Sequence, residues 1–227
     1  MPIPFAGLVL LAAISPLIGR TLKALNRHLE ADNLRQKRIA VLGARGVGKT
    51  HFIRFLSTGE IPVAYQQTVA RAKVKGRRFK LKDLEINIKD SVDVSGAKDA
   101  YAEWKALQEE ADLVLYLMRA DRLLAGDESV ERRVREDLTH IGEWLRSRNR
   151  RPMFFIVGTF CDMDPDFKKL TREKAGDYQD KFQRLPIVRE LVLRAGGTSL
   201  ARVVLGSMKT KDLTEQLAAS LFEQVFE

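Results

Sequence analysis

The fold of this chain is decided by the stretch KRIAVLGARGVGKTHFIRFLS, residues 37–57. It begins as an apolar strand-like run, ends in a helical pattern, and between them Gly43 to Thr50 match G-x-x-x-x-G-K-[ST] at every fixed position. Glycines in such a turn let backbone N–H groups point inward around phosphate oxygens, and the helix start adds the positive end of its dipole. We therefore predict a phosphate-binding loop that includes Gly43, Gly46, Val47 and Gly48. Lys49 is expected to contact the β- and γ-phosphates and Thr50 to ligate Mg²⁺.

Downstream of this loop, apolar runs alternate with segments of helical pattern. The apolar runs typical of buried strands are residues 112–118, 152–158 and 202–206. The helical patterns cover residues 49–57, 98–110, 128–148, 178–195 and 210–226, with a break expected near Pro186. Such alternation predicts an α/β fold with a mostly parallel sheet and helices on both faces. We expect a three-layer P-loop domain over residues 37–227, with six strands in its sheet.

The positive charge of the chain is concentrated in two stretches. Among 227 residues there are 39 Lys and Arg against 30 Asp and Glu, a formal net charge of +9. Residues 71–82 hold seven basic and no acidic side chains, and residues 20–38 hold six basic and two acidic ones. These two stretches account for the whole excess, so bulk charge does not indicate nucleic-acid binding. The single cysteine, Cys161, excludes an intrachain disulfide framework and a cysteine-based zinc site.

The basic stretch 71–82 belongs to a predicted pair of strands. Residues 69–75 and 78–90 alternate apolar and basic side chains, and Gly76-Arg77 between them predicts a hairpin turn. Lysines on such a hairpin protect a sheet edge from aggregation, and they can also bind anionic lipid. No aromatic interleaving accompanies the charge, so we expect no nucleic-acid partner.

The beginning of the chain is uncharged. Residues 3–19 (IPFAGLVLLAAISPLIG) would span about 25 Å as a helix, just short of a hydrocarbon core of about 30 Å. Arg20, Lys23 and Arg27 follow, and by the positive-inside rule they leave the rest of the chain on the cytoplasmic face. We expect a membrane-anchor helix in residues 1–19 and a basic linker helix in residues 20–36. A helix lying in the interface and one packed on the protein stay open as alternatives.

Two further motifs follow predicted strands and concern the metal and the base. Asp93-Val94-Ser95-Gly96 has the form D-x-x-G, in which the carboxylate reaches Mg²⁺ through water and the Gly96 N–H senses the γ-phosphate. Thr159-Phe160-Cys161-Asp162 stands where guanine-specific proteins have [NT]-K-x-D. Asp162 is expected to accept hydrogen bonds from guanine N1–H and the N2 amino group, which adenine does not offer. Phe160 replaces the usual lysine and is expected to stack on the base.

A last motif, Ser207-Met208-Lys209, resembles the S-A-K loop whose backbone N–H groups bind guanine O6. With these motifs in order, the chain resembles the small GTPase superfamily from about Lys37 to the C-terminus. The segment DVSGAKDAYAEW, residues 93–104, is similar to the Arf-type pattern D-V-G-G-Q-D-K-…-W. The uncharged N-terminal segment is similar to those of Arf-like proteins and of the β subunit of the signal recognition particle receptor.

The resemblance implies a molecular switch at a membrane that binds GTP or GDP with Mg²⁺ and has an effector or activator protein as partner. It maps the effector-loop threonine, which closes on Mg²⁺, to Thr68, with Thr58 as a competitor. It also implies that the basic hairpin is coupled to the N-terminal helix.

Two positions depart from the family pattern close to the expected γ-phosphate. Ala97 replaces the glutamine that orients the attacking water, and Arg45 stands where many relatives have glycine. We therefore expect slow intrinsic hydrolysis, completed by Arg45 or by a partner. One alternative is a non-hydrolysing GTP-bound module that recruits a partner to the membrane, and the other is an ATP-dependent P-loop enzyme.

Overall fold

The computed structural model describes residues 38–61, 72–74, 77–81, 84–88, 91–93, 101–147, 151–170 and 174–225. Between residues 72 and 93 it describes the backbone of short strands alone. The predicted helices in residues 1–19 and 20–36 lie outside these ranges and stay predictions. Among the described residues, no helix combines the length and the apolar character needed to cross a membrane.

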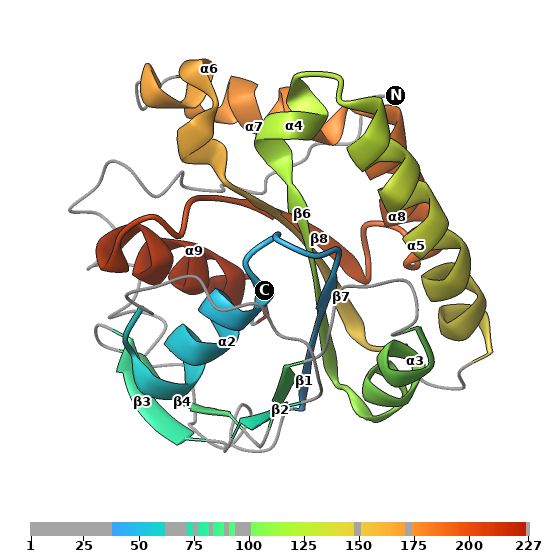
Figure 1. The fold of residues 1–227 in the computed structure, drawn as a ribbon, viewed down its shortest axis with the longest axis vertical. Coiled ribbons are helices and arrows are strands. Elements are labelled where there is room, and N and C mark those ends of the chain that lie inside the picture. Colours follow the sequence, from blue (N-terminus) through green and yellow to red (C-terminus); the bar gives the residue numbers. More distant parts are fainter. Residues whose placement is uncertain are drawn as a thin grey trace.

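A parallel sheet forms the middle layer (Figure 1). Its strands lie in the order β1 (Ile39–Gly43), β6 (Leu113–Arg119), β7 (Met153–Thr159) and β8 (Ala201–Leu205). The predicted strands at 112–118, 152–158 and 202–206 are thus confirmed to within one residue. The described part of the chain places four strands in this sheet, so the expected sheet of six is not confirmed.

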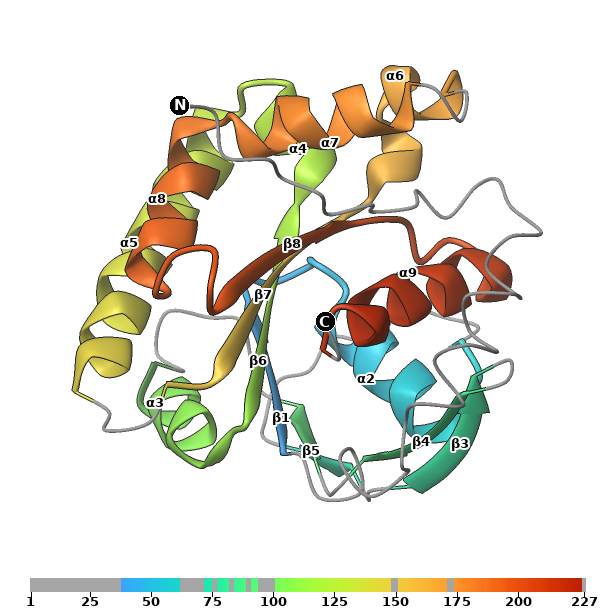
Figure 2. The ribbon, with the colours of Figure 1, turned by 180° about the vertical axis from the view of Figure 1, so that it is seen from behind.

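Helices cover both faces of the sheet, as Figures 1 and 2 show. On one face lie α2 (Lys49–Thr58) and α9 (Lys211–Glu223). On the other lie α3 (Tyr101–Glu110), α5 (Glu128–Arg146) and α8 (Pro186–Arg194). The shorter elements near the carboxyl ends of β6 and β7 are α4 (Ala120–Leu124), the 3₁₀ turn η2 (Cys161–Met163), α6 (Pro165–Lys168) and α7 (Ala175–Gln183). The break predicted near Pro186 is confirmed, since Pro186 begins α8 after α7 has ended.

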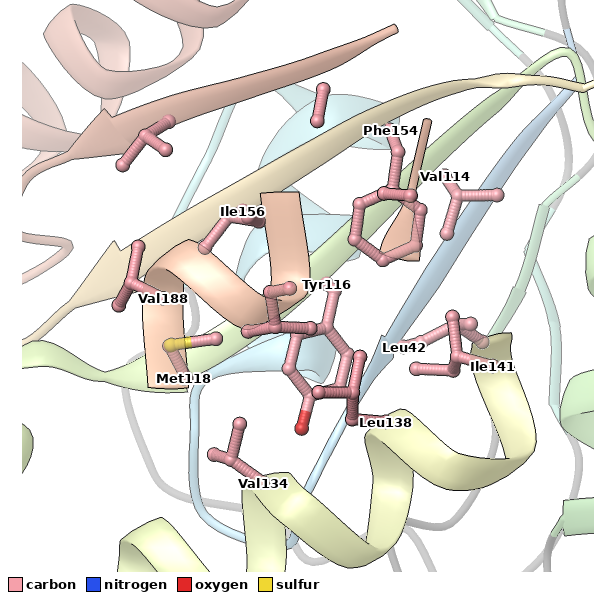
Figure 3. Packing of buried hydrophobic residues seen from close by; sticks show 14 of the residues in the cluster. Leu42, Val114, Tyr116, Met118, Val134, Leu138, Ile141, Phe154, Ile156 and Val188 are labelled. Atoms are coloured by element: carbon pink, nitrogen blue, oxygen red, sulfur yellow. The ribbon is translucent and has the colours of Figure 1, made fainter. Parts of the chain in front are cut away.

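Strand β6 shows why both layers of helices form. Its residues are buried almost throughout, and because side chains alternate along a strand they serve two cores. Leu113, Leu115 and Leu117 pack with α2 and α9. Val114, Tyr116 and Met118 pack on the other face, against the apolar stripe of α5 and part of α8, including Val134, Leu138, Ile141 and Val188 (Figure 3). The continuous apolar run therefore specifies a strand covered on both sides.

The predicted basic hairpin is wrong in its pairing. The structure pairs β3 (Arg77–Leu81) with β4 (Leu84–Ile88), and β2 (Ala72–Val74) with β5 (Ser91–Asp93), both antiparallel. The chain therefore reverses between Leu81 and Leu84, which are register partners, and not at Gly76-Arg77. The segment 78–90, expected to be one strand, is divided by this reversal. The predicted turn was placed at Gly76 because glycine is a strong local turn signal. The pairing of a strand depends instead on the whole run of residues that faces it, and for β3 that run is β4.

One carboxylate lies inside the core and ties α3 to α5 and β6. Asp137 is fully buried. Its Oδ1 accepts hydrogen bonds from the Tyr101 hydroxyl at 2.6 Å and from Arg133 Nε at 2.9 Å, and its Oδ2 accepts one from the Tyr116 hydroxyl at 2.8 Å. Burial raises the pKa of Asp137, although these donors act in the opposite direction. The network fixes the start of α3 against the sheet.

Candidate functional site

Three of the segments with predicted functional residues lie at one edge of the sheet. The loop after β1, the residues after β7 and the residues after β8 all follow carboxyl ends of parallel strands. Figure 1 shows β6 and β7 running to this edge, into α4 and α6. Ligands of open α/β sheets bind in this position. The parallel sheet therefore brings together three motifs that the sequence showed only in their order along the chain.

The loop after β1 has a backbone that side chains other than hydrogen would not allow. Gly43 and Gly48 have φ values of 138° and 96°, in the region that favours glycine. A Cβ added to Gly43 would lie 2.3 Å from the backbone oxygen of Leu117, and one added to Gly48 would lie 2.3 Å from Met208 Cε. The first glycine lets the loop approach β6, and the second lets it approach the loop after β8.

Lys49 and the start of α2 are the features of this loop that suit an anion. The Lys49 side chain is buried, and its Nζ donates to the backbone oxygens of Gly43 and Ala44, both at 2.9 Å. Helix α2 begins without a capping side chain, as α4, α7 and α8 also do, and it has no acidic residue in its first turn. A cationic group beside an uncapped helix start is the arrangement that binds phosphate through backbone N–H groups. The residues present therefore fit a nucleotide phosphate.

Thr159 joins the phosphate loop to the strands beside it. The side chain is fully buried, and its Oγ1 lies 3.0 Å from the backbone oxygens of both Val47 and Met118. The sequence placed Thr159 among the nucleotide-binding residues. In the structure its hydroxyl is bonded to the protein itself, so its effect on a ligand is exerted through the position of the loop.

Asp162 and Ser207 meet across the ends of β7 and β8. The Ser207 hydroxyl donates to Asp162 Oδ1 at 2.6 Å, and the Lys209 backbone N–H donates to Ser207 Oγ at 3.1 Å. Ser207 is buried and Asp162 is half-buried, and the hydrogen bond from Ser207 holds the carboxylate of Asp162 in place. Met208, between Ser207 and Lys209, packs with Val47 in the core beneath the phosphate loop. Base-directed and phosphate-directed segments thus form one continuous site.

Phe160 and Arg119 form a contact that the sequence analysis missed. Phe160 has a φ of 59°, and it is the one non-glycine residue with a positive φ in the described ranges. The Arg119 guanidinium carbon lies 4.0 Å from the Phe160 ring centroid. Arg119 is itself held by Asp121, with Nε to Oδ1 at 2.7 Å and Nη2 to Oδ2 at 2.5 Å. The available sequence signal was a charged residue at the end of an apolar parallel strand, at the edge where ligands bind.

Several predicted residues cannot be placed in this site. Thr68, Gly96 and Ala97 lie outside the described residues, and Asp93 is described through its backbone alone, as the last residue of β5. Thr50 lies half-buried in the first turn of α2. The Mg²⁺ ligand set of Thr50, Thr68 and Asp93 therefore stays a prediction. Arg45 is exposed within the phosphate loop.

Comparison with known proteins identifies the superfamily. A family model described as "50S ribosome-binding GTPase" matches residues 38–158, which is more than half of the chain. No curated protein matches the chain. The matched region contains the phosphate loop and strands β1, β6 and most of β7, and it does not single out Arf-like relatives. The phosphate loop, the Asp162–Ser207 pair and this match agree, and the chain belongs to the GTP-binding P-loop GTPases of the family described as 50S ribosome-binding GTPase.

Proposed function

We propose that this protein is a GTP-dependent molecular switch that selects guanine through Asp162, binds Mg²⁺ with the nucleotide, and hydrolyses GTP slowly at the cytoplasmic face of a membrane. The observation that carries the proposal is the Asp162 carboxylate, held by the Ser207 hydroxyl at 2.6 Å next to a phosphate loop. Guanine offers two adjacent donors to such a carboxylate, and adenine offers none there. A fixed carboxylate at this place therefore favours GTP over ATP.

The phosphate side of the site supports binding and electrostatic catalysis. Lys49 and the N–H groups at the start of α2 are placed to hold the phosphates, and Thr50 is proposed to hold Mg²⁺, which neutralises charge on the β- and γ-phosphates. Hydrolysis would be an in-line attack of water on the γ-phosphate, helped mainly by positioning and fixed charge. Ala97 has no group that orients this water, so the step is expected to be slow until Arg45 or a partner supplies one.

The test of base selection is Asp162→Asn, with Asp166→Asn on exposed α6 as the matched control. The new amide can still accept the Ser207 proton, but it presents an N–H donor to the donors of guanine. Affinity for GDP should fall by about 100-fold or more, because two charge-assisted hydrogen bonds are lost. Affinity for XDP should rise, because xanthine has an acceptor in place of the N2 amino group. Calorimetry showing tighter binding of ADP than of GDP, or no effect of Asp162→Asn, would contradict the proposal.

The hydrolysis rate distinguishes a GTPase switch from a GTP-bound module that does not hydrolyse its nucleotide. Ala97 favours a second candidate, a non-hydrolysing GTP-bound module that recruits a partner. Single-turnover assays with purified protein should give slow but measurable GDP formation, and repeated turnover should release phosphate. A rate on the order of 1 s⁻¹ without a partner would refute slow hydrolysis. A complete lack of phosphate release would favour the second candidate.

Membrane association is proposed from the sequence of residues 3–19 and of the basic stretch 71–82. Carbonate extraction of the full chain, compared with a chain that begins near Asp32, tests it. The full chain should stay with the membrane and the shorter one should be released. Release of both would remove the membrane-spanning anchor from the proposal and leave the nucleotide site unaffected.

A further inference from the structure

We infer that Arg119 is a positioning residue for base recognition: it stacks on one face of the Phe160 ring and holds that ring as a platform for the guanine base. This inference rests on the proposed function, because it requires a base beside Asp162. It adds a residue pair, Arg119 and Asp121, to the determinants of nucleotide binding.

The topology brings Arg119 to the base-directed loop. Arg119 ends β6 and Thr159 ends β7, and the two are register partners in adjacent parallel strands. Phe160 follows directly, with Asp162 two residues further on. The guanidinium at the end of one strand therefore faces the ring at the end of the next, at 4.0 Å from the ring centroid. This distance is well within the range of a cation–π stack.

The backbone of Phe160 shows that the residue is constrained by its surroundings. A bulky residue at a φ of 59° is strained, and such a conformation persists where its surroundings impose it. Arg119 covers the ring from one side, and Phe160 as a whole remains half-buried, so the protein does not enclose the residue completely. A constrained and incompletely enclosed aromatic residue next to a guanine-directed carboxylate suits the stacking of a base.

The charge on Arg119 argues for a role toward the base and not toward phosphate. Asp121 binds the guanidinium through two of its nitrogens, and the side chains of Arg119 and Asp121 are 23% and 11% exposed. The hydrogen bond to Asp121 is the main cause that raises the pKa of Arg119, with Asp162 a smaller contributor. A guanidinium neutralised in this way is a weak partner for phosphate, but its flat face still stacks. Here Arg119 brings a cation to the place where the usual lysine of the family has been replaced by Phe160.

The test measures three ligands on Arg119→Ala: GDP, IDP and inorganic tripolyphosphate, which has no base. IDP lacks the N2 amino group of GDP, and stacking on the ring does not depend on that group. Affinity for GDP and for IDP should therefore fall by the same factor, about threefold to tenfold. Affinity for tripolyphosphate should stay unchanged. The matched control is Arg122→Ala, since Arg122 on α4 forms an exposed ion pair with Asp127. It should change none of the three affinities.

Two further variants separate positioning from a merely structural role. Arg119→Ala combined with Asp121→Ala removes the whole pair, so no carboxylate is left unpaired, and it should show the same loss for GDP. In a Phe160→Ala background, Arg119→Ala should have no further effect, because the platform on which it acts is gone.

Three results would overturn the inference. One is an unchanged GDP affinity in Arg119→Ala. Another is an equal loss for GDP and tripolyphosphate, which would mean general damage to the site. The third is a loss that persists in the Phe160→Ala background. In each case a wild-type preference for GDP over ADP would leave the proposed function standing, whereas lack of that preference would refute both.

Discussion

Replacement of Thr159 by valine is the most direct test of how the two halves of the site are joined. Valine has nearly the shape of threonine and lacks its hydroxyl. Thr159 is fully buried, and its Oγ1 lies 3.0 Å from the backbone oxygens of Val47 in the phosphate loop and of Met118 in β6. The variant therefore removes one donor between two backbone acceptors and leaves the packing intact.

The size of the effect follows from these contacts. One hydroxyl proton can serve one carbonyl at a time, so the loss amounts to about one buried hydrogen bond, or about 1–2 kcal/mol of stability. If the loop relaxes without nucleotide, binding must restore its shape at the same cost. The affinity for GDP should then fall by up to about tenfold, since 1.4 kcal/mol corresponds to a factor of ten.

Urea denaturation without nucleotide measures the first quantity, and calorimetric titration with GDP measures the second. Thr159→Ser is the matched control, because it keeps the hydroxyl and loses a buried methyl group. It should lose about 1 kcal/mol of stability and keep its GDP affinity. The reasoning fails if Thr159→Val matches the wild type in both assays, or if the serine variant loses as much affinity as the valine variant.

Three other substitutions test the close approaches and the buried charge. Gly48→Ala should weaken GDP binding by at least about tenfold in calorimetry, because the φ of 96° is strained for alanine and the new Cβ would lie 2.3 Å from Met208 Cε. Gly158→Ala should destabilise the fold by about 1–3 kcal/mol in urea, since its Cβ would lie 2.3 Å from Leu205 Cδ2; unchanged stability would contradict the packing. Asp137→Asn should lose stability relative to the wild type most strongly at acid pH. Burial raises the pKa of Asp137 in the folded state. The contribution of the protonated Asp137 to folding stability is therefore complete below the pKa of the unfolded chain, about 4, and is lost as the pH rises through the pKa of the folded state. Urea curves at pH 4 and pH 7 should show this deficit shrinking, and a growing deficit would contradict the sign.

The core of the fold was predictable because its signals are local. Continuous apolar runs gave β6, β7 and β8, and the stripe of period 3.6 gave α5. Pro186 marked the break between α7 and α8, since proline fits the first position of a helix and not its interior. The pairing of β2 with β5 was not predictable in this way. It joins segments separated by another hairpin, and no local pattern in either strand specifies its partner.

The same distinction applies to the site. Each motif was found in the sequence, but that the motifs after β1, β7 and β8 share one edge is seen in the structure, where these strands are parallel in one sheet. The contact between Arg119 and Phe160 was missed because neither residue belongs to a pattern that names the other. The role of Thr159 was predicted only in part. Its motif placed Thr159 at the site. The structure shows that Thr159 is buried and bonded to the phosphate loop, so it acts on the loop and not directly on the ligand.

Three of the basic residues at this edge, Lys49, Arg119 and Arg45, explain why we expect slow hydrolysis. Lys49 is buried and its Nζ is hydrogen-bonded to two carbonyls of the phosphate loop, so the position of this cation within the loop is fixed. A fixed cation suits binding of phosphate throughout the reaction. Arg119 is neutralised by Asp121 and turned toward Phe160. Arg45 is exposed in the phosphate loop, so water screens its charge. Charge that develops on a γ-phosphate is stabilised best by a cation in a site from which water is excluded. A partner that covers Arg45 would provide that exclusion, so the stabilising cation can come from this chain. The group that orients the water, absent at Ala97, would still be supplied by Arg45 or by the partner.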